Sequence, residues 1–126
     1  MADPTSALHS ALLAALTTAC SCDVWDGVPQ NTPYPYLVMD FTSSQNEDFT
    51  NQRMDRRFVF LSIWSRNPGQ KEVMDIIAEV ETLHEQPLTL TTGQAASVRV
   101  ERKRTYREAD NLTFAGQVTL RVLTTH

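Results

Sequence analysis

The feature that most constrains the fold is a strand-like stretch at residues 57–65, which is apolar at six of its nine positions. Successive side chains of a strand point to opposite faces. One face of this segment therefore receives three aliphatic residues and the other receives three aromatic residues. They are Val59, Leu61 and Ile63, and Phe58, Phe60 and Trp64, respectively. A strand that is apolar on both faces is typical of the centre of a sheet, and its second cover is expected from another layer of the domain or from another subunit.

Two segments show the periodicity of amphipathic helices. Apolar residues recur every three or four positions from Leu8 to Ala19, and the preceding Asp3-Pro4 pair favours a helix start. A second helix is expected between Asn67, as its cap, and Pro87, which would end it. Its apolar stripe would contain Val73, Ile76, Ile77, Val80, Leu83 and His84.

The remaining apolar patterns predict strands. The expected strands cover residues 36–42, 97–106 and 112–123, with a short extended piece at residues 24–28. This order of elements predicts an α+β fold, in which both helices pack on one face of a mostly antiparallel mixed sheet. At 126 residues the chain fits a single domain, 1–126. The polar stretch at residues 43–55 is expected to be a mobile loop or a long hairpin tip, mobile in the free subunit and ordered in an assembly.

Composition excludes several classes of protein. Apolar residues make up 41% of the chain and charged residues 21%, which indicates a globular domain. The longest apolar runs have four or five residues, so we expect no membrane span and no secretory signal. Two cysteines are too few for a disulfide scaffold. The expected protein is soluble and intracellular.

No pattern in the sequence predicts an enzyme, a cofactor or a metal. His9, His84 and His126 have no catalytic motif around them, and the four glycines form no phosphate-binding loop. Cys20 and Cys22 form a Cys-x-Cys pair without the further ligands that zinc needs. We expect both thiols to be reduced and structural.

Charge is distributed unevenly along the chain. The first 50 residues contain no Lys or Arg, all eleven basic residues lie from Arg53 onward, and five of these fall within residues 99–107. Strict alternation along a strand divides these five between both faces. Arg99, Lys103 and Arg107 would lie on one face, and Arg102 and Arg104 on the other. The asymmetry fits either a solvated surface or complementary surfaces on neighbouring copies.

Nucleic-acid binding is disfavoured as the main activity. The formal net charge is -4, and the basic strip contains one aromatic residue, Tyr106. A single-strand binder normally offers several aromatic side chains on which bases stack. The sequence therefore predicts no stacking platform.

Four segments resemble one known family. Residues 24–30 (Val-Trp-Asp-Gly-Val-Pro-Gln) and 33–38 (Pro-Tyr-Pro-Tyr-Leu-Val) resemble the opening signature of the tail-completion, or tail-terminator, family of long-tailed bacteriophages and gene transfer agents. Residues 60–66, followed by Gly69 and Glu72, are similar to its strand-to-helix junction. Residues 116–122 resemble its final strand.

The resemblance runs from about residue 5 to residue 124 in the family's order and spacing, and it departs from the family only locally. Residues 108–111 replace an Asp/Gly-rich turn, and residues 43–55 match nothing in particular. These departures concern loop contacts rather than the fold.

The resemblance implies a structural virion protein without catalytic activity or cofactor. Such a subunit forms a ring, commonly a hexamer, on the head-proximal end of the tail tube, where it stops tube polymerisation and offers a surface for joining the head. The implied partners are other copies of the chain, the tail tube protein and a head-completion or connector protein. DNA would only pass through the lumen. The implied location is the head–tail junction of the virion, after assembly in the host cytoplasm.

Two other functions remain open at this point. The first is a head–tail connector or adaptor subunit, which also forms a ring but binds on the head side. The second is a small-ligand domain with a helix-covered sheet.

Ring closure is expected to use the charge asymmetry, because a head-to-tail contact pairs two different surfaces of one chain. The candidate acidic residues are Asp40, Glu47 and Asp48. The candidate basic residues are Arg53, Arg56, Arg57, Arg102 and Arg104. Alternatively, the basic strip faces DNA in the lumen.

Overall fold

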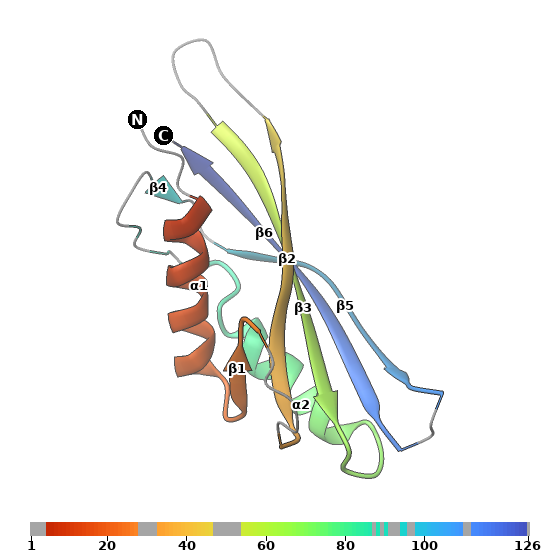
Figure 1. Cartoon of the computed structure of the whole chain (residues 1–126). Helices are drawn as coiled ribbons and strands as arrows, with labels where there is room; N and C mark the ends of the chain where they lie inside the picture. The colour runs from red at the N-terminus through yellow and green to blue at the C-terminus, as the bar shows by residue number, and fades with distance from the viewer. Residues whose placement is uncertain are drawn as a thin grey trace.

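The computed structural model describes residues 5–27, 33–46, 54–86, 88, 90, 94–95, 98–109 and 112–125. Figure 1 shows two helices beside a long twisted sheet. The helices are α1 (Thr5–Ala19) and α2 (Lys71–Glu81). The strands are β1 (Asp23–Trp25), β2 (Tyr36–Asn46), β3 (Met54–Ser65), β4 (Gln94–Ala95), β5 (Arg99–Arg107) and β6 (Phe114–Thr125).

The sheet has the strand order β1-β2-β3-β6, and β4 and β5 both pair with the outer edge of β6. Only β1 and β2 run parallel, while the other pairs are antiparallel. Both helices lie on the same side of this sheet (Figure 1). The predicted α+β class, with a mostly antiparallel mixed sheet, is confirmed.

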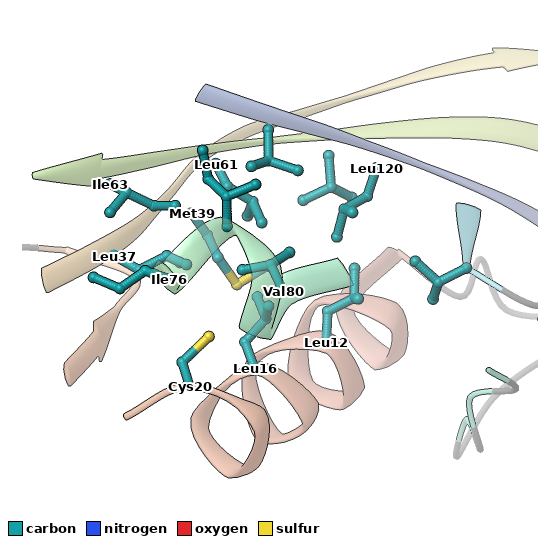
Figure 2. Close-up of a cluster of buried hydrophobic side chains, with 14 of the residues drawn as sticks. Leu12, Leu16, Cys20, Leu37, Met39, Leu61, Ile63, Ile76, Val80 and Leu120 are labelled. Carbon is teal, nitrogen blue, oxygen red and sulfur yellow. The ribbon is translucent and has the colours of Figure 1, made fainter. Parts of the chain in front are cut away.

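The core forms between the helices and one face of the sheet (Figure 2). The aliphatic face of β3 supplies Val59, Leu61 and Ile63, as the alternation predicted. Helix α1 contributes one buried leucine per turn, and α2 contributes a stripe of Val and Ile. These residues are Leu8, Leu12 and Leu16, and Val73, Ile76, Ile77 and Val80. The aromatic face of β3 points away from the helices.

Helix α1 lies where the sequence predicts it, whereas α2 is shorter than expected. Asn67 does not cap α2, because the helix begins only after Gly69, whose φ of 90° is not helical, and Gln70. The side chain of Asn67 instead donates a hydrogen bond to Glu72 over 3.4 Å. His84 lies in the turn beyond α2, where its Nδ1 accepts a bond of 2.9 Å from the amide of Val100.

The loop expected at residues 43–55 is shorter than predicted, because strands extend into it from both ends. Strand β2 continues to Asn46 and β3 begins at Met54, and Ser43 pairs with Phe58 and Asn46 with Asp55. Pairing with the neighbouring strand satisfies the backbone hydrogen bonds of these polar residues. They can therefore form a strand without apolar side chains. The central part of the expected loop, residues 47–53, lies outside the described residues.

Helix α2 approaches the sheet closely at Gly116 of β6. A Cβ atom placed on Gly116 would lie 2.6 Å from Val73 Cγ1 and 3.1 Å from Ile77 Cδ1. Val73 is a branched side chain in a fully buried position, so it has little room to move aside. The missing side chain at Gly116 therefore sets the distance between α2 and the sheet.

We expect Gly116→Ala to lower the free energy of unfolding by about 1–3 kcal/mol, because the added methyl group overpacks the contact with Val73. Gly27→Ala is the matched control, since nothing lies within 4 Å of a Cβ at Gly27. The control should change stability by less than about 0.5 kcal/mol. Equilibrium urea unfolding measures both, and equal stabilities would contradict the close contact.

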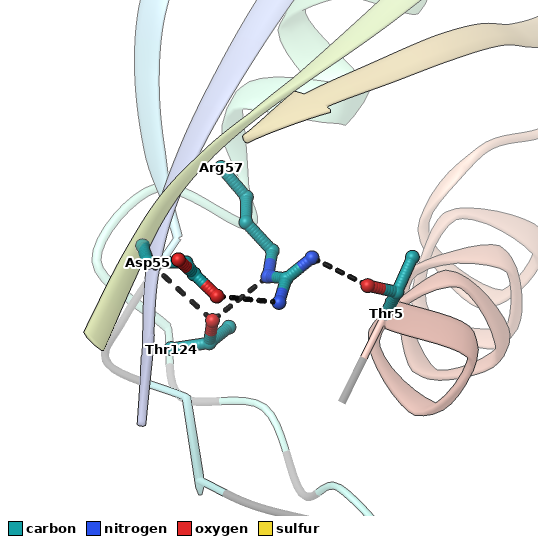
Figure 3. A network of polar contacts seen from close by, with 4 residues as sticks. All are labelled: Thr5, Asp55, Arg57 and Thr124. Carbon is teal, nitrogen blue, oxygen red and sulfur yellow. Dashed lines mark hydrogen bonds and ion pairs between the residues drawn. The ribbon is translucent and has the colours of Figure 1, made fainter. Parts of the chain in front are cut away.

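Arg57 is a buried charge that joins three parts of the fold (Figure 3). Its guanidinium donates to Thr124 Oγ1 of β6 over 2.8 Å and to Thr5 Oγ1 of α1 over 2.6 Å. It also forms an ion pair of 3.1 Å with Asp55 on its own strand. A buried charge is tolerated only when it is paired and hydrogen-bonded, and Arg57 meets both conditions.

Replacing Arg57 with Met should cost about 3 kcal/mol or more of folding stability, because Asp55 and two hydroxyl groups lose their partner. Arg102→Met is the control, since Arg102 is exposed and surface changes usually stay within about 0.5 kcal/mol. Chemical denaturation compares the two variants. If Arg57→Met kept full stability and lost only self-association, Arg57 would instead act at an interface.

Candidate functional site

The face of the sheet opposite the helices carries a line of aromatic side chains. We call it the uncovered face, because no described residue forms a second layer over it. It consists of Val38 of β2, Phe58, Phe60, Ser62 and Trp64 of β3, and Ala115, Gln117 and Thr119 of β6, with the neighbouring β5 residues. Phe58, Phe60 and Trp64 are half-buried within the single chain. A partly exposed apolar surface of this kind is suited to contact with another molecule.

The arginines of β5 border the uncovered face more fully than strict alternation predicts. The pairing of β5 with β6 shifts register just before Arg102, and such a bulge moves the following side chains to the other face. Arg99, Arg102 and Arg104 therefore lie on the uncovered face. Their partners on β6 are Arg121, Thr119 and Gln117. Lys103 and Arg107 lie on the helix side, so the prediction that Arg99 shares their face is wrong.

The other predicted basic residues lie in different places. Arg56 of β3 is half-buried on the uncovered face, opposite Gln45. Arg57 lies on the helix face and is only 1% exposed, so it is a structural residue of the monomer rather than a surface residue. Arg53 lies outside the described residues.

Of the predicted acidic residues, the structure describes Asp40 alone, since Glu47 and Asp48 lie outside the described residues. Asp40 is the extra residue at a register shift in β2, between Met39 and Phe41. The hydroxyl of Ser62 donates a hydrogen bond to its carboxylate. This bond holds Asp40 over the uncovered face, on the side away from β5.

Several charges on the uncovered face are already partnered within the chain. Arg121 forms an ion pair of 3.4 Å with Glu101, and Arg104 lies 4.9 Å above the ring of Tyr106. Partial burial and the nearby Glu108 raise the pKa of Tyr106, so it stays a neutral hydrogen-bonding group. Arg102, with an exposed side chain, and Arg104 form the outer border of this face.

A hollow of about 330 Å³ lies at one end of the uncovered face. Its walls include Tyr34, Tyr36, Trp64, Arg66 and Glu108. The two tyrosine rings lie 5.1 Å apart, and the Arg66 guanidinium lies 4.7 Å above the Tyr34 ring. Burial, followed by the hydrogen bond with Tyr34, raises the pKa of Tyr36. The hollow thus combines aromatic rings with the charged side chains of Arg66 and Glu108.

An acidic hollow lies on the helix side of the molecule. A hollow of about 390 Å³ between α2, β1 and residues 33–35 is lined by Asp23, Glu72, Asp75 and Glu79. Glu79 accepts bonds of 2.8 Å and 2.9 Å from the amide and hydroxyl of Ser21. This acidic surface lies at the β1 edge of the sheet, whereas the arginines lie at the β5 edge.

Cys20 and Cys22 lie beside this acidic surface as free thiols. Their mutual hydrogen bond, together with burial, raises the pKa of Cys20, while the same bond lowers the pKa of Cys22. Within the described residues, no group of three or more His, Cys, Asp or Glu side chains is placed to hold a metal ion. Neither described helix is long and apolar enough to cross a membrane.

The alternation within each strand did not predict that aromatic and basic residues would share one face. The aromatic residues of β3 and the arginines of β5 share one face because β6 lies between the two strands. Tyr106 is thus one of several aromatic groups on that face. That the chain offers no platform for stacking bases stays a prediction. The two long alternating segments, which became β5 and β6, could predict that the strands are adjacent. They could not predict the bulge in β5 that brings its arginines to the uncovered face.

Comparisons with known proteins agree with this architecture. The model of the family described as "Tail completion protein gp17" matches residues 6–125. A chain from the solved structure "Virion of native gene transfer agent (GTA) particle" has the same fold, with a TM-score of 0.86, 14% sequence identity and full coverage of both chains. No curated protein sequence matches the chain. On the family match across nearly its whole length, the chain belongs to the tail completion protein gp17 family, whose members are structural proteins of the virion tail.

Proposed function

We propose that this protein forms a ring of six subunits, which closes the head-proximal end of the tail tube. The ring stops tube polymerisation and then offers its other side to the proteins that join the head. The observation that carries this proposal is the family match over residues 6–125. The uncovered apolar face supports it, because such a face suits assembly better than a solitary subunit.

Termination of this kind needs shape rather than bond chemistry. One side of the ring would match the last ring of the tube, and the other side would not template a further tube ring. A heterologous contact between neighbouring subunits generates a closed ring when its rotation closes. The acidic and basic surfaces at opposite edges of this sheet are suited to such a contact.

The arginines on the uncovered face and Asp40 remain candidates for contacts between neighbouring subunits. Exposed charge pairs contribute only about 0.2–1 kcal/mol each, so apolar contact would supply most of the affinity. Charge would mainly set the orientation and the association rate. Self-association should therefore weaken as the salt concentration rises.

Adding this protein to polymerising tail tube protein should halt elongation and shorten the tubes. The physical reason is that a bound ring removes the templating end. Length distributions from negative-stain images, with and without this protein, measure the effect. An unrelated protein of similar size at the same concentration is the control.

Unchanged tube lengths would contradict the terminator role. Binding to isolated tubes and to DNA-filled heads, measured by co-sedimentation, extends this test. Attachment to heads alone would assign the protein to the connector side of the joint instead.

A further inference from the structure

We infer that neighbouring subunits overlap, an inference that rests on the proposed ring. The β5 border of the uncovered face of one copy covers the acidic helix-side surface at the β1 edge of the next copy. The partner is thus a second copy of this chain. Neighbouring sheets would be separated by a layer of helix rather than joined edge to edge.

The aromatic residues of β3 supply the apolar part of this contact. Phe58, Phe60 and Trp64 are half-buried in the single chain and have no covering layer among the described residues. Buried aromatic anchors surrounded by a polar rim are typical of the centre of a protein interface. The hollow beside Trp64 extends the same surface and can accept a partner side chain.

The charges fix how the two copies face one another. Arg102 and Arg104 lie on the uncovered face at the β5 edge. Asp75 of α2 lies on the helix side, in the acidic hollow at the β1 edge that Asp23 also lines. These two surfaces occupy opposite faces and opposite edges of one sheet. A head-to-tail overlap brings them together in every contact, whereas two uncovered faces packed on each other would bring two arginine-rich surfaces together.

DNA is the other candidate partner for a basic face, and the surface fits it less well. Glu101 lies among the arginines and already pairs with Arg121 over 3.4 Å, and Asp40 adds a negative charge on the β2 side of the same face. The centre of the face is apolar, whereas phosphate contacts need a continuous basic track. The net charge of -4 also opposes binding to DNA.

Two charge-reversal variants test the overlap. Variant A carries Arg102→Glu and Arg104→Glu, and variant B carries Asp23→Lys and Asp75→Lys. All four residues are exposed, so both variants should keep their circular dichroism spectra and thermal midpoints. Each variant alone should associate with itself at least about tenfold more weakly than the wild type, because like charges then meet in every contact. Sedimentation velocity measures the association.

An equimolar mixture of A and B should restore assembly. The acidic surface of A meets the unchanged arginines of B, and the new lysines of B meet the new glutamates of A. Every contact in an alternating ring is then complementary. A mixture that stays monomeric, or a variant that assembles as the wild type does, would overturn the inference.

The apolar part of the contact has its own variant. Phe60→Thr keeps a β-branched residue in the strand and should weaken self-association at least about tenfold by removing an aromatic anchor. Leu112→Thr is the matched control, because Leu112 is 66% exposed and lies just before β6, outside the uncovered face. Equal association of the two variants would contradict the use of this face.

The outcomes also separate this inference from the proposed function. Wild-type rings that form but fail to stop tube growth would refute termination and leave the overlap standing. Rings of variant A that form normally and still stop tubes would refute the overlap and leave termination standing.

If variant A loses only DNA binding in a mobility-shift assay while its rings form normally, the uncovered face is a DNA surface and the inference is wrong. A wild type that stays monomeric even with tubes present also overturns it.

Discussion

The structure depends on one imbalance: β3 has apolar side chains on both faces, and the two helices cover only one of them. The aliphatic face gains its burial inside the chain, where leucines of α1 and the Val and Ile stripe of α2 complete it. The aromatic face gains only partial burial. Burial of apolar area is the main driving force for association, so further burial of this face, as the described residues leave it, would be favourable.

A surface used for assembly must keep its shape, and the opposite face of the sheet provides the support. Gly116 allows α2 to lie directly on β6, and Arg57 ties α1 to β3 and β6 through side-chain hydrogen bonds. Both contacts lie on the helix side. The aromatic face can therefore be exposed to a partner without being needed to hold the sheet together.

The sequence predicts the fold class, the position of α1 and the two faces of β3, because those elements follow regular periods of 3.6 and 2 residues. Irregularities within a strand are harder to predict from the sequence. The bulges beside Asp40 and Arg102 each add one residue, and nothing in an alternating pattern shows where an extra residue lies.

Arg57 was predictable in principle. Arg57 lies two residues before Val59, so alternation places it on the core side of β3. Its positive charge instead suggested that the side chain lies on the surface. Its partners, Thr5 and Thr124, come from distant parts of the chain. Only the folded structure shows that they meet. The start of α2 was misplaced for a local reason, since the left-handed φ of Gly69 separates Asn67 from the helix.

The position of β6 has a consequence for how the subunit is made. This strand follows every other element in the sequence, yet it lies between β3 on one side and β4 and β5 on the other. During synthesis, β3 and β5 therefore cannot form their pairing with β6 until that strand has been made. Contacts between such distant segments form late and slow folding. The border of the uncovered face that carries the β5 arginines thus forms only after β6 has been synthesised, and a chain that lacks β6 has no such surface to offer a growing virion.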